Sequence, residues 1–275
     1  MKRRGDNFRT IRSTPTFKIS TNMRPYILAE TNWKALKETR FDLAILPWGA
    51  TEAHNYHLPY GTDNYEADAL AAAAAAHAWE AGGRVVVLPT IPFGVNTGQA
   101  DIYLDMNLNP STQLAILDDV AATLHRHGIQ KLVVFNSHGG NNFKALLREL
   151  GLRYPDLFVC MTNWFRAMDR ETYWEAPGDH ADEAETSLML HLRPDLVLPR
   201  ESWGDGASRK FRIEGLNQDW AWAERKWSEV SADTGVGDPS AASAEKGARF
   251  FRDVSRKIGA FLLELSRADP ADMYG

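Results

Sequence analysis

The chain has 275 residues, of which 44% are hydrophobic and 24% charged, and its formal net charge of −5 argues against a nucleic-acid partner, which needs a concentrated cationic surface. A single cysteine, Cys160, excludes a disulfide framework and a thiolate metal cluster, which fits a cytoplasmic protein whose metal ligands, if any, are His and carboxylate. No stretch approaches the roughly 18 consecutive apolar residues of a membrane span, and the basic N-terminus, residues 1–6, lacks the apolar run of a signal peptide, so we expect a cytosolic lead-in and no membrane partner.

Short apolar runs rich in β-branched residues alternate with longer segments of helical period. This pattern predicts an α/β fold with a parallel sheet covered by helices on both faces. The segment around residues 66–80 is mostly alanine, which favours a helix that packs closely on a sheet or on a neighbouring subunit. In chain order, we expect strands at 43–47, 84–89, 131–135 and 157–162, and helices over about 66–80, 109–128, 143–152, 183–192 and 241–267.

Residues 201–232 differ from the rest of the chain because they are rich in Trp, charge and glycine without a clear period. Five of the nine Trp residues lie between Trp174 and Trp227. We therefore expect an irregular excursion from the sheet at 201–232. Because no repeat or linker divides the chain, we expect a single domain over 1–275.

The loop after the first predicted strand concentrates carboxylates and imidazoles. Glu52 and His54 are two residues apart, so both side chains point the same way in an extended segment and can bind neighbouring metal ions. Asp63 follows after a turn, and it is the candidate bridge because a carboxylate can bind two cations through its two oxygens. His57 is expected to support the ligands rather than to bind a metal directly.

Two further chemical motifs follow later strands. The third strand runs into Asn-Ser-His-Gly-Gly-Asn-Asn at 136–142, where His138 is the candidate ligand. His180 precedes a predicted helix that carries Glu183 and Glu185. These two glutamates lie about 200° apart around the helix, so we expect Glu185 to face the site and Glu183 to face solvent or an interface.

Each motif taken alone has an ordinary structural explanation. Glu-x-His is common in solvated loops and His-Gly-Gly also forms phosphate-binding turns. Asp179 could simply cap a helix, and Asp182 could favour the helix dipole. The coincidence of the motifs is more informative, because four of the eight histidines fall at strand ends or a helix start beside carboxylates. This favours a metal site. The other four histidines are predicted to be surface or packing residues: His77, His125, His127 and His191.

Together these motifs resemble the creatininase, or creatinine amidohydrolase, family. The similarity runs over about residues 45–247, and the motifs occur in the family's order. They are Glu52-Ala-His54-Asn-Tyr-His57-Leu58-Pro59 with Thr62-Asp63, Asn136-Ser-His138-Gly139-Gly140-Asn141, His180-Ala181 with Glu185-Thr186-Ser187, and Gly237-Asp238-Pro239.

The resemblance implies a Rossmann-like three-layer fold, oligomers often built as hexamers, and hydrolysis of small, often cyclic amides at two divalent metal ions. These ions would be Zn²⁺ or Mn²⁺, with iron as a further candidate. Carried over, Glu52, Asp63 and His138 would hold one metal, and His54 with bridging Asp63 the other. Creatininase has a glutamate two residues after its histidine where this chain has Gly140, and Glu185 is expected to replace that carboxylate.

The loop over residues 93–107 departs from creatininase and resembles a subgroup associated with inositol catabolism. Members of that subgroup resemble 3-dehydro-scyllo-inosose hydrolases, which cleave a carbon–carbon bond in a cyclic diketone. Asn96, Gln99 and Asp101 would then read substrate hydroxyls, although a hydrogen-bonded turn network explains them equally well. Trp164 and Trp174 are candidate pocket walls, with core packing as the alternative for both.

His180 is expected to be catalytic, as an imidazole free of metal that transfers a proton to the leaving group. Two other classes of function compete with this hydrolase. One is a metal-binding oligomeric protein without turnover, whose Trp-rich excursion forms an interface. The other is a nucleotide-binding module, which is disfavoured because no Gly-x-Gly-x-x-Gly follows the first strand.

Overall fold

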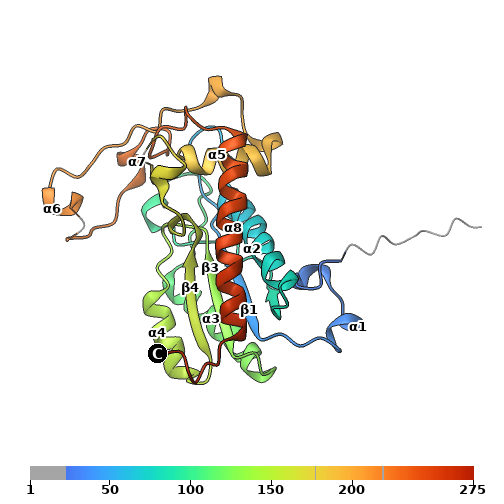
Figure 1. The fold of residues 1–275 in the computed structure, drawn as a ribbon. Helices are drawn as coiled ribbons and strands as arrows, with labels where there is room; N and C mark the ends of the chain where they lie inside the picture. The colour runs from blue at the N-terminus through green and yellow to red at the C-terminus, as the bar shows by residue number, and fades with distance from the viewer. Residues whose placement is uncertain (1–22, 177, 219) are drawn as a thin grey trace, which may run out of the picture.

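The computed structural model describes residues 23–176, 178–218 and 220–275, so the expected N-terminal lead-in lies outside the described residues. Its centre is a parallel sheet in the order β2-β1-β3-β4 (Figure 1). The strands are β1 (Leu43–Trp48), β2 (Val85–Val87), β3 (Lys131–Asn136) and β4 (Phe158–Asn163). All four predicted strands are therefore confirmed, although β2 is shorter than expected.

Five long helices connect or follow the strands, as the periodicity predicted. They are α2 (Thr62–Glu80), α3 (Pro110–Arg126), α4 (Lys144–Arg153), α5 (Glu183–Leu192) and α8 (Ala244–Arg267). Helix α2 begins at Thr62 rather than near Glu66, so Asp63 lies in the first helical turn and not in the loop. Within the described residues, the helices are all too short or too polar to cross a membrane.

The sheet separates two layers of helices, which confirms the predicted three-layer α/β fold. Successive strand residues point to opposite faces. Leu43 and Ile45 of β1 pack with α2, α5 and α8, whereas Ala44 and Leu46 pack with α3 and α4. Because both faces are covered, β1 and β3 are buried along their whole length.

Helices α2 and α8 approach each other closely because small residues line their contact. A Cβ on Gly259 of α8 would lie 2.6 Å from the His77 Cβ and 2.9 Å from the Ala74 carbonyl oxygen. The alanines of α2 pack on this helix and on the sheet, as their size predicted. This packing fixes α2, and with it Asp63, against the sheet.

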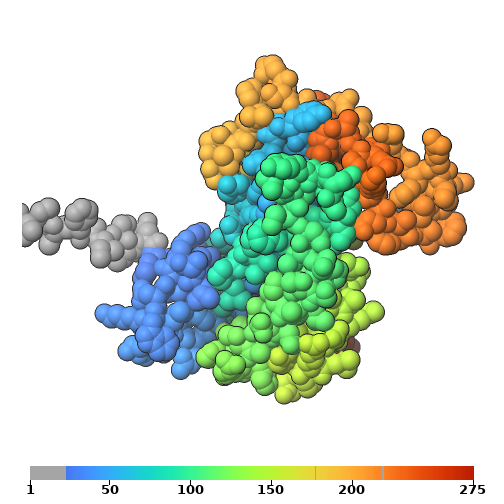
Figure 2. Space-filling view, turned by 180° about the vertical axis from the view of Figure 1, so that it is seen from behind, coloured from blue at the N-terminus to red at the C-terminus, as the bar shows by residue number. Residues whose placement is uncertain are grey.

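Residues 201–232 form an irregular excursion that contains the short helices α6 (Glu214–Asn217) and α7 (Trp227–Val230). The orange segment around α6 stands away from the sheet in Figure 1, and Figure 2 shows it projecting from the body of the molecule. Trp220 and Trp222 are 76% and 82% exposed, whereas Trp227 is buried. The excursion thus rejoins the body of the molecule at α7. A further short helix, α1 (Trp33–Leu36), precedes β1.

Candidate metal centre

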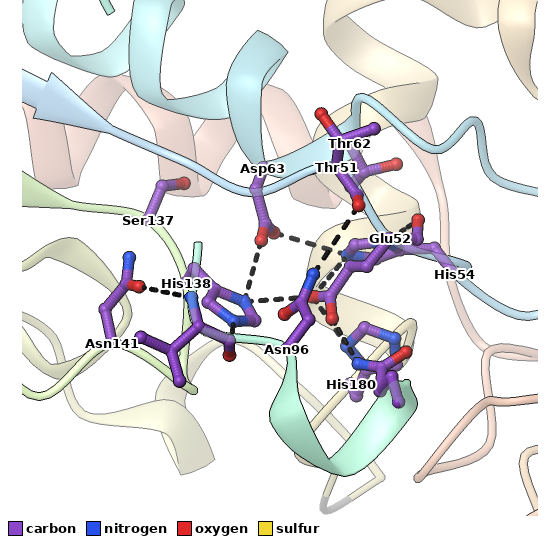
Figure 3. A network of polar contacts seen from close by, with 12 residues as sticks. Thr51, Glu52, His54, Thr62, Asp63, Asn96, Ser137, His138, Asn141 and His180 are labelled. Atoms are coloured by element: carbon purple, nitrogen blue, oxygen red, sulfur yellow. Dashed lines mark hydrogen bonds and ion pairs between the residues drawn. The ribbon is translucent and has the colours of Figure 1, made fainter. Parts of the chain in front are cut away.

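The predicted ligands meet at the carboxyl ends of β1 and β3. The loop after β1 supplies Glu52 and His54, the residue pair after β3 supplies His138, and the start of α2 supplies Asp63. All four side chains are almost completely buried. Figure 3 shows them pointing toward one another. Parallel strands end at the same edge of the sheet, which explains why residues far apart in sequence converge here.

Two groups of potential ligands share Asp63. Glu52, Asp63 and His138 form one group, and His54, Asp63 and Glu185 form the other, each with ligand atoms within 4.8 Å of one another. His138 Nδ1 lies 3.0 Å from Asp63 Oδ2, whereas His54 Nε2 lies 3.2 Å from Asp63 Oδ1. Asp63 therefore turns one oxygen toward each group, which is the geometry that a bridging carboxylate requires.

His180 lies at the same cluster. Its Nδ1 is 3.7 Å from Glu52 Oε1, and its ring centroid is 4.2 Å from that of His54. Glu52, His54 and His180 also form a group that could hold an ion. The position of His180 is thus compatible with metal ligation and with proton transfer.

Backbone carbonyls fix the orientation of all three imidazoles. The His54 Nδ1, His138 Nε2 and His180 Nε2 atoms lie 3.1, 3.0 and 2.8 Å from the carbonyl oxygens of Glu52, Val95 and Ala53. A carbonyl only accepts, so these nitrogens carry the proton and donate. The other nitrogen of each ring then presents a lone pair toward the carboxylates, as in metal-binding histidines.

This arrangement fits a pair of divalent cations. Lone pairs and carboxylates that face one another repel unless a positive charge lies between them. Glu52 Oε1 and Asp63 Oδ2 are buried and receive no hydrogen bond from the residues that the structure describes, as expected for oxygens that bind ions. The combination of imidazole nitrogen and carboxylate oxygen suits Zn²⁺ and Mn²⁺.

The pKa shifts at the cluster reflect the same concentration of negative charge. Burial lowers the pKa of His54, but the carboxylates of Asp63, Glu185 and Glu52 together reverse this and raise it to about 10. Burial raises the pKa of Glu185 to about 8, and Asp63 adds to the effect while His54 opposes it. The field of the buried carboxylates therefore favours positive charge at this position.

Asn96 and Gln99 line the cavity beside the cluster, but their amide groups contact Glu52, one of the candidate metal ligands. The Gln99 Nε2 donates to Glu52 Oε2. The end of the Asn96 amide also lies 3.2 Å from the same oxygen. Both residues thus hold Glu52 in place. The third residue of this predicted set, Asp101, is exposed outside the cavity and accepts from Ser228 Oγ at 2.5 Å.

The two predicted tryptophans have different positions. A cavity of about 670 Å³ opens beside the cluster, and Trp164 lines it while donating from Nε1 to Ser137 Oγ at 2.8 Å. Trp174 instead packs in the hydrophobic core, with its ring 5.0 Å from that of Phe250. The expectation that Trp174 walls the pocket is therefore wrong, because the core takes up its apolar surface.

His57 and Glu183 lie next to the cluster. His57 Nε2 is 2.9 Å from Thr186 Oγ1 and its ring stacks on Trp203, which agrees with a supporting role. The expectation that Glu183 faces solvent or an interface is wrong. Glu183 is fully buried, accepts from the backbone N–H groups of residues 175 and 176, and pairs with Lys246 Nζ at 2.5 Å.

One residue of the site was missed from the sequence. Glu66, one helical turn after Asp63, is fully buried and has no hydrogen-bond partner among the described residues; burial, and then Glu185, raise its pKa well above the usual range. Its spacing from Asp63 was the available signal. Gly140 is required because a Cβ there would overlap the Val95 carbonyl oxygen and lie 2.5 Å from His138 Nε2.

Comparisons with known proteins agree on one family. The profile of the family described as creatinine amidohydrolase (Creatininase) matches residues 29–262. A solved structure described as a putative creatinine amidohydrolase from Bacteroides fragilis is 40% identical, covers 91% of this chain and 99% of its own, and has a TM-score of 0.85. The mycofactocin precursor peptide peptidase of Mycobacterium tuberculosis is 29% identical over 219 residues, covering 75% of this chain and 79% of its own.

Solved creatininases share the fold at lower identity. A mutant creatininase in a Zn–Zn form is 22% identical with a TM-score of 0.72, and covers 88% of this chain and 99% of its own. A manganese form of creatininase has a TM-score of 0.71. The layers and the parallel sheet described above are therefore those of an established fold.

Proposed function

This chain belongs to the creatininase family of metal-dependent amidohydrolases, and from that premise we propose that it is a two-metal hydrolase of a small carbonyl substrate, with an amide as the bond cleaved. One observation carries the proposal. The three imidazoles His54, His138 and His180 each donate one N–H to a backbone carbonyl and direct the other nitrogen into a buried carboxylate cluster.

The proposed ligands follow the two groups described above. Glu52, Asp63 and His138 would hold one ion, and His54, Asp63 and Glu185 the other. Bound there, a pair of divalent ions would lower the pKa of a water and polarise a substrate carbonyl. Zn²⁺ and Mn²⁺ are the proposed ions, because related creatininases are known in Zn–Zn and manganese forms. Iron has a similar preference for these donors.

His180 is proposed to be catalytic and to move the proton. Its Nε2–H is held by the Ala53 carbonyl, so only Nδ1, which faces the cluster, can accept a proton and return it to a leaving nitrogen. Burial lowers the pKa of His180, and the neighbouring His54 adds to this effect, so the ring is neutral at pH 7. A neutral ring has the free lone pair that a proton acceptor needs.

A small cyclic substrate fits the cavity of about 670 Å³, and a cyclic amide is the proposed form. An inositol-derived cyclic diketone is a more specific alternative substrate. The same attack of water on a polarised ring carbonyl can also break a carbon–carbon bond. The 93–107 loop adds little support for it, since Asn96 and Gln99 contact Glu52 and Asp101 lies outside the cavity. The related peptidase makes a short peptide amide a further substrate to test.

Metal analysis of two variants tests the proposal. Asp63→Ala should lose both ions, because Asp63 contributes to both groups. His180→Ala should keep both ions and lose turnover by about 10²- to 10⁴-fold on the substrate found by screening cyclic amides, lactones, short peptides and cyclic diketones. Loss of metal from His180→Ala would make His180 a ligand, and two ions retained in Asp63→Ala would refute the bridge.

The competing proposal of a metal-binding protein without turnover makes a different prediction, namely two bound ions and no hydrolysis of any compound in this screen. A homo-oligomer in the cytoplasm remains part of our proposal. The exposed Trp220 and Trp222 of the 201–232 excursion are compatible with an interface. Light scattering of the purified chain measures the oligomeric state directly.

A further inference from the structure

The wall of the cavity that follows β3 and β4 carries positive charge that has no protein partner. Lys144 begins α4 after β3, and Arg166 ends a short turn of helix directly after β4. Both line the cavity, and no carboxylate of the described residues lies within 4 Å of either one. The other two cations of the cavity are neutralised, in the pairs Arg170–Asp182 and Arg225–Asp179.

Two neutral side chains of the same wall also present donors. Ser137 is buried and its oxygen accepts from Trp164 Nε1 at 2.8 Å, so its own O–H remains free to donate. Asn136 Nδ2 donates to Asn163 Oδ1 at 2.8 Å, which fixes the amide of Asn163 and leaves its Nδ2 as a free donor. Ser137 and Asn163 both line the cavity.

The orientation of Asn163 is itself fixed, because Asn136 cannot rotate. The Asn136 oxygen accepts from the backbone N–H of His138 at 3.2 Å and from Asn141 Nδ2 at 3.0 Å. Its nitrogen must therefore face Asn163. The wall formed by Ser137, Lys144, Asn163 and Arg166, here called the donor wall, thus offers hydrogen-bond donors and positive charge.

The donor wall is separate from the proposed metal ligands. Its residues come from the ends of β3 and β4, which pair in register at Asn136 and Asn163, and from the start of α4, whereas most of the proposed ligands come from the β1 loop, α2 and α5. Figure 3 shows Ser137 and His180 on opposite sides of His138. A substrate that reaches from the metal ions to this wall would meet its free donors and its two cations.

We propose that the donor wall binds a carboxylate of the substrate, distinct from the carbonyl that is attacked, so that the enzyme hydrolyses an anionic amide. This inference rests on the proposed function and names its substrate class. A carboxylate accepts hydrogen bonds through two oxygens and donates none, so it matches a surface of free donors. Lys144 and Arg166 are the residues that set this preference.

Paired hydroxamates test the proposal by direct binding. Each pair has a hydroxamate at one end to bind the metal ions, one to four methylenes, and either a carboxylate or the neutral carboxamide at the other end. Calorimetry on the metal-loaded protein should show the carboxylate binding roughly 10-fold more tightly for at least one chain length. The double variant Lys144→Met with Arg166→Met should abolish the preference, so that the carboxylate and the carboxamide of each pair bind with equal affinity.

The control is Arg148→Met, which removes an exposed cation from the same helix, outside the cavity, and should keep the preference. Equal affinity within every pair, or a preference that persists in the double variant, overturns the carboxylate site. If neither hydroxamate of any pair binds, the metal centre itself is refuted and this inference falls with it. Thermal unfolding confirms that the variants are folded.

Discussion

Glu183 tests how the structure holds the segment that carries His180. Its carboxylate accepts from the backbone N–H groups of residues 175 and 176 at 2.7 and 2.9 Å and pairs with Lys246 of α8. The Glu183 side chain is 0% exposed, so these contacts, and not water, satisfy its carboxylate. Glu183→Ala therefore leaves two backbone donors unsatisfied and removes one partner of a buried ion pair.

The cost follows from those contacts. Each unsatisfied donor costs about 1 kcal/mol, and losing the charged partner adds about 1 to 2 kcal/mol, because Lys246 keeps Glu175 and the Ala241 carbonyl. The total of about 3 to 4 kcal/mol should lower the melting temperature by roughly 6 to 12 °C. Glu183→Gln keeps an acceptor for the two donors and should lose less.

Thermal unfolding followed by circular dichroism, at fixed metal concentration, measures both variants. Glu264→Ala is the matched control, since Glu264 is exposed on α8 and should shift the free energy of unfolding by less than about 0.5 kcal/mol. If Glu183→Ala matched this control, the buried network would contribute nothing measurable and the reasoning would be refuted. If Glu183→Gln cost as much as Glu183→Ala, the ion pair rather than the backbone donors would dominate.

Three other perturbations have defined outcomes. Burial lowers the pKa of His57 from 6.5 to about 4, so between these pH values His57 is protonated in the unfolded chain but not in the folded one. The free energy of unfolding should therefore fall as the pH drops through this window. In urea titrations, His57→Gln should lose about 3 kcal/mol less stability over the same pH range. Gly140→Ala should weaken metal binding by 10-fold or more in a chelator competition, because the new Cβ would press on the Val95 carbonyl that orients His138. An unchanged metal affinity would contradict the role of this carbonyl in fixing the His138 tautomer. Stripping the metal with a chelator should lower the melting temperature, and Zn²⁺ or Mn²⁺ should restore it, since a ligand that binds only the folded chain stabilises it; an unchanged melting temperature would count against a metal centre.

The fold was largely predictable because its signals are local. Continuous apolar runs such as 132–135 mark strands buried on both faces, and the amphipathic period of 244–267 marks α8. The start of α2 was less accessible. Thr62 and Asp63 resemble loop residues by composition, but Thr62 Oγ1 donates to the Pro59 carbonyl and the helix begins there. That contact depends on a turn that the sequence pattern does not specify.

The residue types of the candidate ligands could be predicted from the sequence, whereas the contacts that support them could not. Glu52, His54 and His138 follow strand ends, which parallel topology brings together. Glu183 was expected to face solvent or an interface because helical geometry alone puts it opposite Glu185. Instead, Lys246 of α8 and the backbone of residues 175–176 give it buried partners outside its own helix. A helical wheel describes one helix alone, whereas the burial of a carboxylate depends on which other elements pack against that helix.

The expected replacement of the creatininase glutamate by Gly140 and Glu185 agrees with a steric limit at position 140. Any side chain at position 140 would overlap the Val95 carbonyl oxygen, which accepts the N–H that sets the tautomer of His138. A carboxylate at 140 would therefore displace the group that orients a metal ligand. With that position closed, the second group of ligands can be completed only from another element, and α5 places Glu185 within 3.9 Å of His54 Nε2. The glycine and the glutamate thus act as a pair, and restoring a glutamate at 140 should impair metal binding even with Glu185 removed.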